Sequence, residues 1–101
     1  MAANFRILLH RNSDNLHVKL SGDFDGSSAH ELLEILKRNC RRTSKIFIHT
    51  SSLNRIHPFG RDVFQSNMDF IKGEATFLVF TGENSSQLAP KREKKTMILQ
   101  A

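Results

Sequence analysis

The stretch that decides the fold runs from Lys45 to Gly60, KIFIHTSSLNRIHPFG. An apolar strand, Ile46-Phe47-Ile48, leads into a polar loop, and Pro58 then starts a helix. In an α/β layer such a junction lies at the carboxyl edge of the sheet, where the N–H groups at the helix start are unpaired. We therefore expect the working surface of the chain at this junction.

Length and composition indicate one globular domain. Of the 101 residues, 39% are hydrophobic and 25% are charged, and no apolar run is long enough to span a bilayer. The N-terminal residues lack the apolar core of a secretory signal. Cys40 is the only cysteine, so neither an intrachain disulfide nor a cysteine-based zinc site is expected. These features predict a cytoplasmic protein.

Upstream of this stretch the sequence predicts a β-hairpin. Residues 5–9 are mainly apolar, residues 11–15 are rich in turn formers, and residues 16–20 alternate between apolar and polar side chains. His10 and His17 flank the predicted turn. Two histidines without a third ligand more often decorate a surface than bind metal, so we predict no metal site.

A helix follows the hairpin. Ser28 and Glu31 have the spacing of a capping box, and Asp25 is the alternative N-cap. Behind them, apolar side chains recur at helical spacing and predict one buried stripe. This stripe consists of Ala29, Leu32, Leu33, Leu36 and Cys40.

The second half of the chain predicts a helix over residues 58–72, a strand over 75–80 covered on both faces, and a helical turn within 83–88. We assign residues 1–90 to the domain and residues 91–101 to a basic C-terminal tail. The predicted core contains Leu33, Leu36, Phe47, Val63, Phe64, Phe77 and Val79.

This order of elements, together with two motifs, resembles a STAS domain, the fold of bacterial anti-sigma factor antagonists. Gly22 and Asp25 match a Gly-x-x-Asp element that precedes the first helix in that family. The deciding stretch resembles the family hallmark, in which a strand, a loop with a hydrophobic residue (Leu53) and an Asp-Ser-Ser-Gly-like turn lead into the second helix. The similarity covers about residues 4–88. It implies an α/β fold whose four-stranded mixed sheet begins with the hairpin and carries two to three helices.

The sequence departs from the family at the hallmark itself. When Gly60 is aligned with the family glycine, His57 takes the acidic position and Pro58 the first serine position. Phe59 then occupies the place of the serine that partner kinases phosphorylate, and a phenyl ring accepts no phosphoryl group. Hydroxyl side chains earlier in the stretch stay open as substitutes, although such residues more often satisfy loop backbone groups. They are Thr50, Ser51 and Ser52.

The resemblance implies a non-catalytic module for signal transduction and transcription regulation in bacteria. It would dock a protein partner of the anti-sigma factor or kinase type, without a cofactor. The residues expected to contact the partner are Asp25, Ser51, Ser52, Leu53, His57, Pro58, Phe59, Gly60 and Phe64. The sequence does not predict the oligomeric state.

Catalytic interpretations have weaker support. Residues 23–27, DFDGS, resemble the nucleophile motif of haloacid-dehalogenase-type phosphatases. That motif should end a buried strand, however, whereas here it follows a half-exposed one, and no second acidic motif completes a metal site. The sequence also lacks a P-loop, a G-x-G-x-x-G fingerprint and a G-x-S-x-G elbow.

An alternative function is binding to nucleic acid or to an anionic surface. The net charge is +5, and basic residues cluster at residues 37–45 and 91–95. The first cluster ends a predicted helix, where cations interact favourably with the helix dipole. No basic motif with interleaved aromatic residues accompanies either cluster, so protein binding is the favoured prediction.

Overall fold

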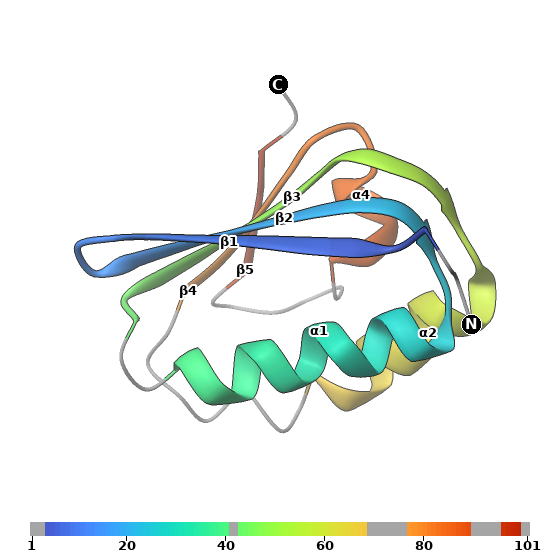
Figure 1. Ribbon diagram of the computed structural model, residues 1–101, viewed down its shortest axis with the longest axis horizontal. Coiled ribbons are helices and arrows are strands. Elements are labelled where there is room, and N and C mark those ends of the chain that lie inside the picture. The colour runs from blue at the N-terminus through green and yellow to red at the C-terminus, as the bar shows by residue number, and fades with distance from the viewer. Residues whose placement is uncertain (1–3, 41–42, 69–76, 90–95, 100–101) are drawn as a thin grey trace.

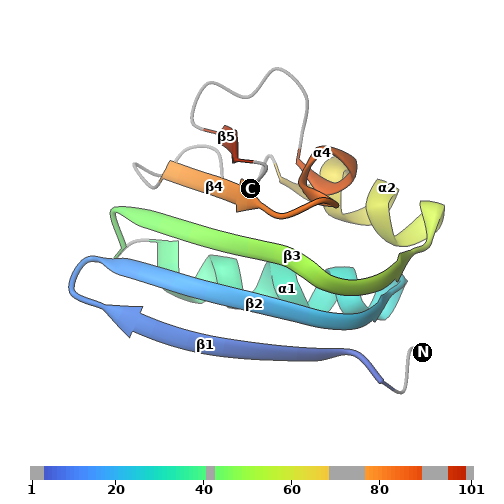
Figure 2. The same ribbon diagram turned by 90° about the horizontal axis from the view of Figure 1, so that it is seen from above.

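The structure, a computed structural model, describes residues 4–40, 43–68, 77–89 and 96–99. Its elements are β1 (Arg6–Asn12), β2 (Asn15–Phe24), α1 (Gly26–Asn39), β3 (Lys45–Ile56), α2 (Pro58–Asn67), β4 (Phe77–Thr81), α4 (Ser85–Leu88) and β5 (Thr96–Leu99). One sheet holds the strands in the order β1-β2-β3-β4-β5 (Figures 1 and 2). β1 is antiparallel to β2, and the other neighbours are parallel.

The helices pack on one face of this sheet (Figure 1). β2, β3 and β4 follow one another both along the chain and across the sheet. Connections between parallel strands are right-handed, so connections that advance in one direction place their helices on the same side. α4 joins this layer beside α2, because the Gln65 side-chain amide donates to the Leu88 carbonyl oxygen at 3.4 Å. The opposite face carries no helix among the described residues and stays open.

The core lies between the sheet and these helices. Phe24 and Phe64 meet edge to face with ring centroids 6.2 Å apart, and Phe64 meets Phe80 in the same way at 6.1 Å. The apolar stripe predicted for the first helix is confirmed, because Ala29, Leu32, Leu33, Leu36 and Cys40 are all buried. Helical spacing therefore identified the inner face of α1.

The predicted α/β class, with its N-terminal hairpin and mixed sheet, is confirmed, and all four predicted strands are present. The structure adds β5, whose residues 96–99 hydrogen-bond beside β4. These residues lie in the predicted tail, so the tail interpretation is corrected for them. β5 is only four residues long, which is too short for the alternation of a strand to be recognised in the sequence. Residues 90–95 lie outside the described ones, so the domain boundary at residue 90 stays a prediction.

Two predicted core residues lie elsewhere. Phe47 and Phe77 are only half-buried, and each precedes a residue of its strand that faces the helices, Ile48 and Leu78. Alternation therefore directs them to the open face. An unbroken apolar run does not reveal which face is covered, and this is why the prediction failed. The other predicted core residues are buried or packed against the core: Leu33, Leu36, Val63, Phe64 and Val79.

The bounds of two elements differ from the prediction. β3 continues to Ile56, so the predicted polar loop is the second half of a strand. Its pairing with β2 shifts register between Lys19 and Ser21, and again between Gly22 and Asp23. Such shifts break the alternation by which a strand is recognised in sequence. α2 ends at residue 67, and residues 69–72 of the predicted helix lie outside the described residues.

Candidate functional site

The predicted working surface lies where the first turns of α1 and α2 meet, at one end of the molecule (Figure 2). The His57 N–H donates to the Phe24 carbonyl oxygen at 2.9 Å, which ties the start of α2 to the end of β2. Gly60 lies against the backbone of Asp25, and a Cβ atom at Gly60 would be 2.6 Å from the Asp25 carbonyl carbon. The two helix starts are therefore held in backbone contact.

Phe59 projects from this junction into solvent. It is 71% exposed, more than any other large hydrophobic residue among the described ones. One side of its ring faces Gly26 at the start of α1, where an added Cβ atom would lie 2.8 Å from the ring. Because Gly26 has no side chain, one side of the ring can pack against its backbone, while the rest of the ring stays exposed.

Asp25 is the N-cap of α1. Its Oδ1 accepts hydrogen bonds from the Ser28 N–H at 2.9 Å and from the Ser28 hydroxyl at 3.0 Å. Ser28 lies inside the helix and is buried, so of the two predicted caps the structure selects Asp25. The bond from the Ser28 N–H, with the hydroxyl bond in support, lowers the pKa of Asp25 from 3.8 to about 2.

Asp25→Ala should lower the free energy of unfolding by about 1 kcal/mol at neutral pH, the typical value for a lost N-cap. The folded state lowers the pKa of this carboxyl group, so the stabilisation is complete above about pH 4 and disappears as the pH falls through about 2. Urea denaturation from pH 6 to pH 2 should therefore show the variant approaching the wild type. Asp62→Ala, an exposed control on α2, should change stability by less than about 0.5 kcal/mol. If the difference in stability between Asp25→Ala and the wild type did not change with pH, the capping role would be contradicted.

Two predicted partner contacts are corrected by their burial. Leu53 and Phe64 belong to the core, and Phe64 has no exposed surface. Leu53 is 7% exposed and Phe64 is fully buried, so they offer a partner little or no surface. Gly60 is also buried, and it permits the contact with Asp25. The predicted residues that remain accessible are Asp25, Ser51, Ser52, His57, Pro58 and Phe59.

The hydroxyl side chains of β3 differ in access. Thr50 is fully buried, and its hydroxyl donates to the Thr81 carbonyl oxygen at 2.7 Å. It serves the packing of β3 against β4 and is closed to a kinase. Ser51 and Ser52 are exposed, so they remain the accessible candidates among the three.

A group of imidazole rings on the open face was not predicted. His17 Nδ1 lies 2.9 Å from His49 Nε2, and His49 Nδ1 lies 2.6 Å from the Thr81 hydroxyl oxygen. Burial lowers the pKa of His49, and the nearby charges of His17 and Lys19 lower it further. His17 and His49 are far apart in sequence, and only the pairing of β2 with β3 brings them together.

The fold matches solved structures. The anti-sigma factor antagonist SpoIIAA, in its unphosphorylated form, aligns with a TM-score of 0.65 and 12% identity over 96% of this chain and 88% of that one. A protein named Mglu aligns with a TM-score of 0.64 and 16% identity over 84% of this chain, which spans only 20% of Mglu. An uncharacterized DUF3478-family protein with a SpoIIAA-like fold, from Shewanella loihica PV-4, aligns with a TM-score of 0.55 and 14% identity over 86% and 76% of the two chains.

No family model and no curated protein matches the sequence. Because the identities are only 12–16%, the structural matches show the fold alone. This protein has a SpoIIAA-like, STAS-like fold. None of its described helices is long and apolar enough to cross a membrane.

Proposed function

We propose that the protein is a non-catalytic regulatory module that docks a protein partner through the junction of α1 and α2. The observation that carries this proposal is the exposed ring of Phe59, seated on Gly26 beside the Asp25 cap. The likeness to SpoIIAA, an anti-sigma factor antagonist, supports a partner of the anti-sigma factor type. On this proposal the protein acts in the cytoplasm of a bacterium, in signal transduction to transcription.

The junction suits an anchor residue. Aromatic side chains that fill a pocket on the partner often dominate the energy of an interface. Pro58 fixes the backbone before Phe59, and the contact between Gly60 and Asp25 holds the helix starts together, so little freedom is lost on docking. Burying most of the ring contributes about 2 kcal/mol or more. The partner should therefore offer an apolar pocket for this ring.

Regulation by phosphate is expected to be absent at residue 59. The resemblance places Phe59 where relatives carry a phosphorylated serine, and a phenyl ring keeps this position uncharged. Adding about two negative charges at such an interface would disrupt docking, and Phe59 cannot receive them. We therefore propose constitutive binding, controlled by the abundance of the partners.

The alternative, binding to nucleic acid or to an anionic surface, gains no support from the described residues. Lys37, in the first basic cluster, lies 3.9 Å from Glu34 on the same helix. Residues 41–42 and 91–95, which supply most of the other basic side chains, lie outside the described residues. Salt dependence separates the two functions, because phosphate contacts weaken by orders of magnitude between about 50 and 200 mM salt.

Site-specific photo-crosslinking tests the docking surface. A photoreactive phenylalanine analogue at Phe59 should capture one specific protein in cells, while the same analogue at Leu8 should not. Leu8 is a matched control, because it is 64% exposed but lies on β1, away from the junction. With the captured partner purified, Phe59→Asp should weaken binding at least about 30-fold. Equal capture at both positions, or unchanged affinity of Phe59→Asp, would contradict the proposal.

Incubation with cell lysate and ATP tests the lost switch. The wild type should acquire no phosphate that releases the partner, whereas Phe59→Ser should become a substrate and bind less after modification. Mass spectrometry locates the phosphate. Stoichiometric phosphate on Ser51 or Ser52 of the wild type, with release of the partner, would show that the switch has moved along β3.

A further inference from the structure

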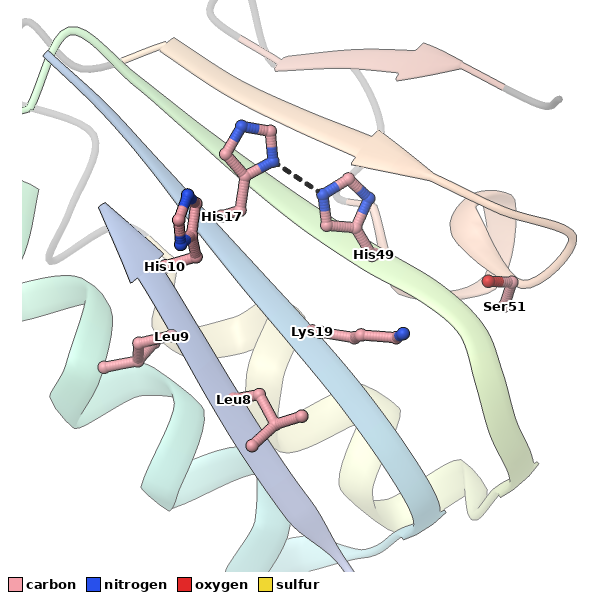
Figure 3. A pocket seen from close by; sticks show the side chains of 7 residues that line it. All are labelled: Leu8, Leu9, His10, His17, Lys19, His49 and Ser51. Atoms are coloured by element: carbon pink, nitrogen blue, oxygen red, sulfur yellow. Dashed lines mark hydrogen bonds between the residues drawn. The ribbon is translucent and has the colours of Figure 1, made fainter. Parts of the chain in front are cut away.

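The open face of the sheet holds a hollow that the proposed docking surface does not use. It lies over β1, β2 and β3 (Figure 3). Its volume is about 520 Å³. This volume is within the range of small-molecule sites. Its walls include Leu8, His10, His17, Lys19, His49 and Ser51.

Several polar groups in these walls lack partners among the described residues. The Lys19 ammonium, the Ser51 hydroxyl and the His10 ring make no hydrogen bond or ion pair there. His17 uses only Nδ1, toward His49, so its Nε2 has no hydrogen-bond partner among the described residues. In contrast, both ring nitrogens of His49 are engaged. The hollow therefore presents donors from three neighbouring strands that nothing described satisfies.

Basic groups gather in the hollow. The titratable groups described around His49 are His17 and Lys19 on β2, and the Thr81 hydroxyl contacts it from β4. His10 on β1 adds a third imidazole, with its ring centroid 6.4 Å from that of His17. None of the described residues that line the hollow is acidic. Burial lowers the pKa of His49, and the charges of His17 and Lys19 lower it further, so a bound anion would oppose this effect.

We infer that the hollow binds a small phosphate monoester. Phosphoryl oxygens would accept hydrogen bonds from the Lys19 ammonium on β2 and the Ser51 hydroxyl on β3, and the organic group would lie on the exposed side chain of Leu8. A phosphate dianion fits because it offers three strong acceptor oxygens to donors that come from different strands. A metal ion fits less well, because an ammonium group lines the site and no three metal-binding side chains come together in the described part of the chain.

Phenyl phosphate is a suitable probe, and the five histidines report where it binds. In NMR spectra of the full chain at pH 7, the ring protons of His10, His17 and His49 should shift as the probe is added. His30 on α1 and His57 beside α2 should not shift, because they lie outside the hollow. The bound anion should also raise the pKa of His49, which burial and the charges of His17 and Lys19 otherwise lower.

Charge variants test the assigned contacts. Lys19→Gln should weaken phenyl phosphate binding about tenfold, the typical effect of a lost hydrogen bond to a charged group. Lys37→Gln removes the same charge from α1 and should leave the affinity unchanged. Phenol, which keeps the ring but lacks the phosphoryl group, should not bind.

Four results would overturn the inference. They are equal shifts of all five histidines, no shift up to about 10 mM probe, equal shifts with phenol, and a response to Zn²⁺ without one to phenyl phosphate. None of these results bears on partner docking, because crosslinking at Phe59 reports on the junction of α1 and α2. The two proposals can therefore fail independently.

Discussion

Phe64→Ala is expected to lower the free energy of unfolding by about 3–5 kcal/mol, the range for removing a fully buried phenyl ring. Phe64 has no exposed surface and lies between Phe24 and Phe80, each of which meets it edge to face. Its removal leaves a cavity where the sheet and α2 meet, and it breaks two aromatic contacts at once. Urea denaturation followed by circular dichroism measures the loss.

Phe59→Ala is the matched control for this experiment. It removes the same ring from the same helix, but at a position that is 71% exposed, so the free energy of unfolding should change by less than about 0.5 kcal/mol. Similar losses in the two variants would mean that the exposed and buried faces of α2 have been assigned wrongly. Phe59→Ala should nevertheless weaken partner binding. Phe64→Ala would thus report on stability and Phe59→Ala on docking.

Gly60→Ala is expected to destabilise the fold by about 1–3 kcal/mol, although alanine is the better helix former. The added Cβ atom would lie 2.6–2.9 Å from the Asp25 carbonyl carbon, carbonyl oxygen and Cα atom. These are backbone atoms at the cap of α1, and they cannot move without separating the two helix starts. Sterics should therefore outweigh helix propensity.

Gly26→Ala provides the contrast, because its added Cβ atom would meet only the ring of Phe59, at 2.8 and 2.9 Å. An exposed ring can rotate away, so the free energy of unfolding should change little. The ring of Phe59 should, however, lose its contact with residue 26. Thermal unfolding of the two variants gives the comparison. A greater loss in Gly26→Ala than in Gly60→Ala would contradict the packing described at the junction.

Local pattern was enough to predict the elements whose spacing is regular. The stripe from Ala29 to Cys40 identified the inner face of α1, and alternation along residues 16–20 identified β2. Gly22, matched to a family element by sequence alone, has a φ of 89°, and a Cβ atom there would clash with the Asn4 carbonyl oxygen. That element is thus explained by backbone geometry.

Features that depend on pairing between strands were beyond the sequence. The register shifts opposite β3 made a strand resemble a loop, so Leu53 was assigned to the surface although it is buried. The contact between His17 and His49 requires the parallel register of β2 and β3. Similarly, the sequence could not show that Phe47 faces the open side. The sequence also could not show that the ring of Phe59 lies against Gly26, because this contact joins two different helices.

The strands stand in the sheet in the same order as in the chain. Each strand after the first therefore finds its neighbour already synthesised, so the sheet can grow by one strand at a time as the ribosome releases the chain, at about 5–20 residues per second. During this growth the newest strand is always the edge that waits for a partner. β5 is the last to arrive, and until then β4 offers an unpaired edge to any other extended chain nearby.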